Sequence, residues 1–151
     1  MADRKHIVDT LEDLIQISRD GQEGYRSSAQ HAKDPDLKLL LNEVSLERAK
    51  FAGELENEAV RWGRADVERS GTMLGAIHRG WANLKAGLGA GDDAILSSIE
   101  TGDEYARRRY DEAIGDSQTP DDILGILRNQ AQAVVGTLDR IRALRRKRDA
   151  A

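Results

Sequence analysis

"GRADVERSGTMLGAIHRGWANLKAGLGAG", residues 63–91, separates two pairs of long amphipathic segments, and it decides the predicted fold. Antiparallel neighbours in a helical bundle are usually joined by about two to eight residues, far fewer than this stretch contains. Apolar residues recur at helical spacing from Met73 to Leu88, so we expect a short helix over about 72–88. Such a helix is ~25 Å long at 1.5 Å per residue, enough to return the chain along a bundle.

Four long segments flank this stretch, and their apolar residues recur every three or four positions, as in helices that bury one face. Pro35 interrupts the first pair, Pro120 starts the last helix, and Asp92 or Asp93 is expected to cap the third. In ferritin-like bundles a short loop joins the first two helices, a long crossover joins the second to the third, and a short loop joins the last two. We therefore predict an all-α, ferritin-like four-helix bundle with a short fifth helix in the crossover between helices 2 and 3. The four long helices are expected at about 4–33, 36–62, 93–114 and 120–147, in a single domain over residues 1–151.

The composition excludes several classes of chemistry. The 151 residues contain no cysteine, which removes disulfides, thiolate nucleophiles and Cys-type zinc sites. The N-terminus is charged, and no segment reaches the ~18 continuous apolar residues of a membrane span, so we expect a cytoplasmic protein without such a span. The net charge of -4 argues against a dedicated nucleic-acid binder.

Polar residues interrupt the apolar stripes at similar heights along the expected bundle. One such position per helix predicts a buried polar layer, made of Gln22, Glu47, Asp103 and Gln130. The second helix has two acceptable seams, Leu40-Val44-Glu47-Phe51 and Leu41-Val44-Arg48-Phe51. The sequence leaves open whether Glu47 or Arg48 faces the core.

Four runs carry a resemblance to a known family. They are "DGQEGY" (20–25), "ERAKFAGEL" (47–55), "HRGWANLKAGL" (78–88) and "ETGDEYA" (100–106). In this order and spacing the chain resembles, over nearly its whole length, a bacterial ferritin-like four-helix-bundle family of unassigned function. The resemblance implies a bundle fold and a soluble bacterial protein, and it is compatible with a stress-associated role. It implies no particular reaction.

Ferritin-like bundles that bind two metal ions use a Glu from each of two helices and a Glu-x-x-His from each of the other two. Here Lys50 follows Glu47 three residues later, and Gln130 stands at a Glu-like position. The metal-ligand candidates are therefore Glu47 and Asp103, and two carboxylates are too few to hold two ferrous ions. We expect no cofactor and interpret the layer as a structural network. The alternative is a divergent oxidoreductase or metal-storage bundle that binds iron or another divalent metal.

Gly21 and Gly24 lie within the first helix, where each costs about 1 kcal/mol relative to Ala. A bulky neighbour that approaches the helix at this level would explain them as packing notches. The candidates for that neighbour are Tyr25, Tyr105 and Trp81 of the crossover.

These features favour a non-catalytic protein that acts through contacts with other proteins. An enzyme is the less favoured interpretation. Amphipathic helices of this kind often pair across a dimer face, so we expect a homo-oligomer, in the simplest case a dimer, or another protein partner. Basic residues near the C-terminus suit an acidic partner, or simply the negative end of a helix dipole. The candidate partner contacts are His78, Arg79, Arg145, Arg146 and Arg148.

Overall fold

Helices are the only regular elements in the part of the chain that the structure describes. The structure is a computed structural model, which describes residues 3–64, 81 and 84–150. Its helices are α1 (Arg4–His31), α2 (Pro35–Arg61), α4 (Leu84–Leu88), α5 (Asp92–Gly115) and α6 (Asp121–Ala150). The prediction of an all-α fold is confirmed. Of the short helix expected over about 72–88, only α4 lies within the described residues.

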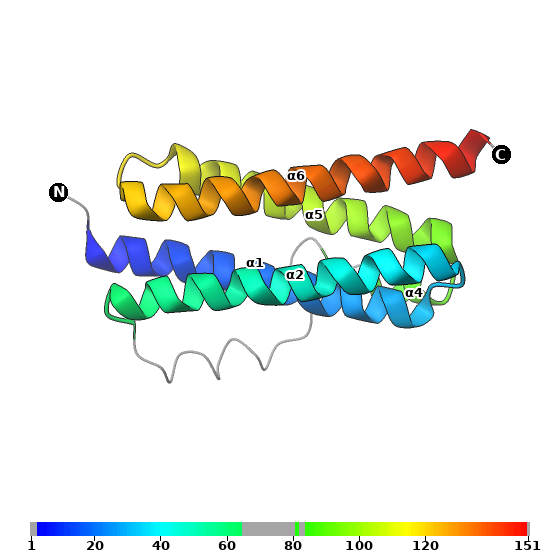
Figure 1. Cartoon of the computed structure of the whole chain (residues 1–151), viewed down its shortest axis with the longest axis horizontal. Helices are drawn as coiled ribbons and strands as arrows, with labels where there is room; N and C mark the ends of the chain where they lie inside the picture. Colours follow the sequence, from blue (N-terminus) through cyan, green and yellow to red (C-terminus); the bar gives the residue numbers. More distant parts are fainter. Residues whose placement is uncertain (1–2, 65–80, 82–83, 151) are drawn as a thin grey trace.

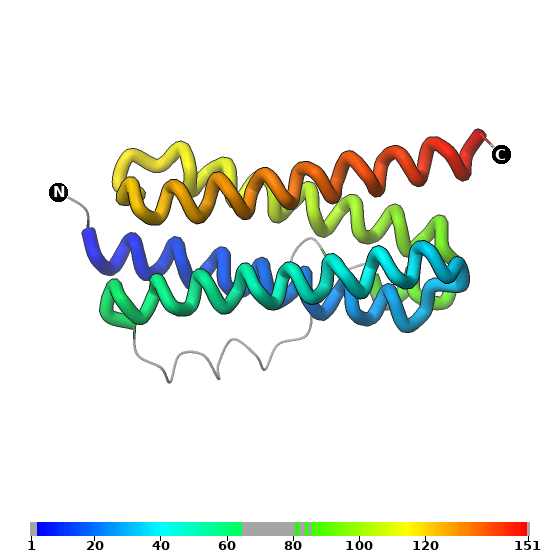
Figure 2. The backbone as a smooth tube through the Cα atoms, viewed as in Figure 1, coloured from blue at the N-terminus to red at the C-terminus, as the bar shows by residue number. Residues whose placement is uncertain are grey.

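The long helices form two antiparallel hairpins, α1 with α2 and α5 with α6, which lie along one another (Figure 1). Each helix packs mainly on its hairpin partner, while α1 also contacts α5 and α2 contacts α6. The end of α2 and the start of α5 lie at opposite ends of the bundle, as the backbone trace in Figure 2 shows. This arrangement fits the expected long connection between the second and third long helices.

The starts of the long helices follow side-chain caps in two cases and a glycine in a third. Asp3 caps α1 by accepting from the Lys5 amide at 3.0 Å, and Asp34 caps α2, whose first residue is Pro35. The cap predicted for α5 is different, because Gly91 precedes the helix with a φ of 103° and no side chain caps it. Asp92 instead lies within the first turn of α5, where its carboxylate accepts hydrogen bonds from the backbone of the loop between α1 and α2.

The core consists of two apolar clusters placed one after the other along the bundle. The first joins the N-terminal half of α1 with parts of α2, α5 and α6, and includes Ile7, Leu11, Leu55, Tyr110 and Leu127. The second joins the C-terminal part of α1 with α2, α4, α5 and α6, and includes Tyr25, Leu41, Trp81, Ile99 and Ile141. Polar side chains occupy the level between the two clusters, and that level holds the candidate site.

Trp81 explains two of the glycines near this level. A Cβ atom on Gly24 would lie 2.5 Å from Cε3 of Trp81, and a Cβ on Gly102 of α5 would overlap the same indole ring. A Cβ on Gly21 would lie 3.3 Å from an Arg48 nitrogen. The prediction that an aromatic side chain packs on the helix-one glycines is confirmed at Gly24, whereas the neighbour of Gly21 is Arg48, which was not among the expected candidates. Trp81 fills the second notch, and Arg48 is the neighbour of the first.

None of the helices found within residues 3–64 and 84–150 combines the length and the apolar character that crossing a bilayer requires.

Candidate functional site

A buried ion pair between α2 and α5 forms the centre of the polar layer. The guanidinium of Arg48 donates from both terminal nitrogens to the carboxylate of Asp103, at 2.6 and 2.8 Å. The two residues are 2% and 0% exposed, so the pair is removed from water. This bidentate geometry is the strongest form of an arginine–carboxylate contact.

Tyr25 of α1 completes the environment of the pair. Its hydroxyl donates to Oδ2 of Asp103 at 2.5 Å, and the Arg48 guanidinium carbon lies 5.1 Å from the centre of its ring. Burial, together with the charge of Asp103, raises the pKa of Tyr25 well above its usual value. Burial alone would lower the pKa of Arg48, but the charge of Asp103 and the hydrogen bonds to it outweigh that effect and raise it. Tyr25 therefore stays protonated and Arg48 stays charged.

A second set of hydrogen bonds extends the layer to α6. The Tyr110 hydroxyl of α5 donates to Oε1 of Gln130 at 2.7 Å, and the Gln130 amide donates to Glu54 of α2 at 3.0 Å. Ser18 of α1 lies 3.4 Å from the Tyr110 hydroxyl. Burial raises the pKa of Tyr110 to about 12. The layer thus joins all four long helices through side chains.

The structure places the four residues of the predicted layer at different depths. Asp103 and Gln130 are fully buried, whereas Gln22 and Glu47 are half-buried. Gln22 accepts from Arg19 at 3.0 Å through its side chain. Of the two seams of the second helix, α2 uses the one that contains Arg48.

Sequence reasoning missed three members of the layer as polar partners. Arg48 was visible only as one of two alternatives, Tyr25 was expected only as a bulky neighbour of the glycines, and no role was predicted for Tyr110. Their hydroxyl groups carry the missing signal, because a buried tyrosine usually needs a hydrogen-bond partner. A tyrosine at the height of an inward carboxylate would have pointed to this pairing.

The donor set of the layer does not fit a dimetal centre. Both oxygens of Asp103 already accept hydrogen bonds, from Arg48 and from Tyr25. Gln130 offers an amide, and its oxygen accepts from Tyr110. Within the described ranges, no three His, Cys, Asp or Glu side chains gather as a metal-ligand group. The negative charge of Asp103 is balanced by the guanidinium of Arg48.

The arginines proposed as partner contacts lie close to acidic residues of α5. Arg145 pairs with Glu100, and Arg148 pairs with Asp93. Arg142 adds bonds to Glu100 and Glu104 at 3.0 and 2.8 Å. These ion pairs join α6 to α5 along the surface. Arg146 is exposed, while His78 and Arg79 lie outside the described residues.

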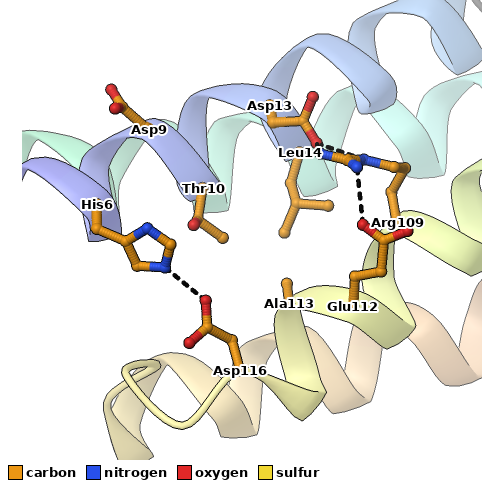
Figure 3. Close-up of a pocket in the computed structure, with 9 residues that line it drawn as sticks. All are labelled: His6, Asp9, Thr10, Asp13, Leu14, Arg109, Glu112, Ala113 and Asp116. Carbon is orange, nitrogen blue, oxygen red and sulfur yellow. Dashed lines mark hydrogen bonds and ion pairs between the residues drawn. The ribbon is translucent and has the colours of Figure 1, made fainter.

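A surface groove of about 270 Å³ runs between α1 and α5 (Figure 3). His6 and Asp116 face each other across one end at 2.5 Å, and Arg109 holds Asp13 and Glu112 at the other, both at 2.8 Å. A hydrogen bond from the backbone amide of Gln118 lowers the pKa of the Asp116 carboxyl, and the hydrogen bond with His6 lowers it further. The carboxylates of the groove are already matched by basic groups, so its contacts connect the two helices.

The family of the chain follows from a comparison with known protein families. The family described as "Domain of unknown function (DUF2383)" matches residues 6–116. The chain belongs to this family. No curated protein shows a significant match.

The family match covers the Arg48, Asp103 and Tyr25 arrangement and ends at the close of α5. Gln130 and the arginines of α6 lie beyond it. The family has no assigned function.

Proposed function

We propose that the protein is a non-catalytic, ferritin-like bundle that acts through contacts with other proteins. The observation that carries the proposal is the buried pair of Arg48 and Asp103. In a ferritin-like bundle the central layer is where metal-binding carboxylates converge. Here a guanidinium supplies the positive charge, and the layer serves to join helices.

The protonation states of the layer support the same conclusion. A general base or nucleophile needs a pKa near the working pH or an activating neighbour. Tyr25 and Tyr110 have raised pKa values and stay neutral at physiological pH. Both carboxylate oxygens of Asp103 are engaged, because they accept three hydrogen bonds from Arg48 and Tyr25. These groups are well suited to holding the fold together and poorly suited to proton transfer.

The ferritin-like assignment is part of the proposal and is supported by the two antiparallel hairpins and the opposite placement of the α2 and α5 ends. A bacterial origin and a stress-associated role also belong to it, and they rest on the resemblance of the four sequence runs. The alternative, a metal-binding oxidoreductase or storage bundle, requires Glu47 and Asp103 to act as ligands.

Elemental analysis and a ferrous iron challenge test the proposal. Protein purified without chelator should contain no stoichiometric metal, and added ferrous iron should not shift its melting temperature. The Glu47→Gln variant is the matched control, because Glu47 is half-buried and its replacement keeps the side-chain size. Stoichiometric iron with a stabilising shift that Glu47→Gln abolishes would overturn the proposal and establish the metal-binding alternative.

A further inference from the structure

A row of apolar side chains on α2 faces away from the core. Leu39 is 61% exposed and Leu46, seven residues later, is 73% exposed. Gly53 continues the row after another seven residues, and a Cβ atom there would have no neighbour within 4 Å. Single exposed leucines are common, but Leu39, Leu46 and Gly53 recur every seven residues and therefore lie along one face of α2. We call Leu39, Leu46 and Gly53 the outer stripe.

Charged residues flank the stripe in a self-complementary order. At about 100° per residue, Glu43 and Lys50 lie about 60° and about 40° from Leu46 around the helix, on the same side of it. Both are exposed. The opposite flank holds Asn42 and Ala49, which carry no charge. One flank therefore carries an acid before Leu46 and a base after it.

An antiparallel copy of α2, related by a two-fold axis at Leu46, matches every one of these features. Leu46 then packs against the partner's Leu46. Leu39 lies ~10 Å along the helix from the axis, at the level of the partner's Gly53, since both are seven residues away at 1.5 Å each. A large side chain thereby faces the open notch at both ends of the contact.

The charges select the antiparallel direction. In that arrangement Glu43 and the partner's Lys50 lie on the same side and differ by ~1.5 Å in height, and the pair occurs twice by symmetry. A parallel arrangement, with the two-fold axis along the helices, would instead place Glu43 and Lys50 beside the partner's uncharged flank, which holds Asn42 and Ala49. Opposite charges therefore meet across the interface only in the antiparallel arrangement.

From these observations we infer that α2 is the dimer interface of this protein, and that its occupant is the α2 of a second copy in antiparallel orientation. The inference rests on the proposed function and names its first protein partner. Each copy contributes two large apolar side chains, fewer than permanent interfaces use, so the dimer should dissociate at micromolar concentrations.

Sedimentation equilibrium of the full chain across the micromolar range tests the inference. The wild type should show a monomer–dimer equilibrium, and Leu46→Lys should be monomeric. The matched control is Val135→Lys, because Val135 is an exposed apolar residue on α6 with 39% exposure, and it should dimerise like the wild type. Circular dichroism should show equal helix content in all variants.

Charge reversal tests the direction of the pairing. Glu43→Lys and Lys50→Glu should each weaken the dimer about tenfold or more, because each opposes like charges twice. The double variant Glu43→Lys/Lys50→Glu should recover the wild-type affinity. An equimolar mixture of the two single variants should form heterodimers, since their charges become complementary.

Three results would overturn the inference: a wild type that stays monomeric, a dimer that Leu46→Lys leaves intact, or a double variant that fails to recover. The outcome is independent of the iron challenge. A monomeric protein that binds no iron would remove the dimer inference alone, whereas a dimer that binds stoichiometric iron would remove the proposed function alone.

Discussion

Arg48 and Asp103 show how one buried contact depends on both of its members. Bringing two charges out of water costs several kcal/mol for each ion, and a close bidentate geometry offsets most of that cost. Removing either partner leaves the other charge buried without compensation. Replacing both by apolar residues removes the cost as well as the attraction.

We predict that Arg48→Met and Asp103→Leu each lower the free energy of unfolding by about 3–5 kcal/mol. The double variant Arg48→Met/Asp103→Leu should lose much less than the sum, because neither charge remains. Urea unfolding at neutral pH measures all three values. The control is Arg26→Met, since the ion pair of Arg26 with Glu23 is half-exposed and should contribute less than about 1 kcal/mol. Additive losses would contradict the coupling.

At the scale of the elements, Asp92 connects the start of α5 to the turn between α1 and α2. Its two carboxylate oxygens accept from the backbone amides of Lys33 and Asp34, at 2.9 and 3.0 Å. The side chain is buried, and the turn follows the last residue of α1. Asp92 thus adds a polar link between the two hairpins at this end of the bundle.

Asp92→Ala should lower the free energy of unfolding by about 2–4 kcal/mol, because two backbone amides lose charged acceptors in a partly buried site. Asp92→Asn keeps one acceptor oxygen and should lose less. Asp93→Ala is the control in the same helical turn, where the side chain is exposed and pairs with Arg148. Thermal and urea unfolding compare the three variants. Equal losses of stability at Asp92 and Asp93 would show that the interaction with the helix dipole, and not the contact with the turn, causes the loss.

The molecule as a whole is two hairpins that share two apolar clusters and one polar layer. Tyr25 and Tyr110 bring hydroxyl groups from α1 and α5 into that layer, and both have raised pKa values. In the unfolded chain a tyrosine ionises near its usual pKa of about 10. The native layer keeps the proton, so ionisation opposes folding of the entire bundle.

We predict a loss of stability in alkaline solution that depends on these tyrosines. A group with a raised pKa contributes stability fully below its unfolded pKa, and that contribution is lost as pH rises through the folded value. For Tyr110 the window runs from the usual 10.0 to about 12. Within this window the free energy of unfolding should fall by about 1.4 kcal/mol per pH unit because of Tyr110, and the raised pKa of Tyr25 adds a loss in the same direction.

Tyr110→Phe isolates this effect, because other groups also titrate above pH 10. The variant should start less stable at pH 8, since Gln130 loses a donor, and its stability should then fall less steeply with pH than that of the wild type. Urea unfolding at a series of pH values from 8 to 11.5 gives both slopes. Parallel slopes would contradict the assignment of Tyr110 as a group that titrates later in the native state.

The spacing of apolar residues by itself determined the all-α fold and the approximate positions of the long helices. Helical periodicity, the proline at residue 35 and the length of the stretch at 63–91 are local properties of the chain. The glycines at 21 and 24 also predicted a close neighbour, because a helix keeps such weak formers only for a reason. The depths of Asp103 and Gln130 followed from the same periodicity.

Only the tertiary structure decided what the buried layer contains. Arg48 and Glu47 are adjacent on α2 and differ by about 100° around the helix, so the rotation of the whole helix about its axis decides which of them faces the core. That rotation depends on contacts with Asp103 and Tyr25, which lie on α5 and α1. The role of Asp92 likewise depends on a turn some sixty residues earlier in the chain. Such partners meet only when the helices pack, because no local pattern records which distant atom a polar group will face.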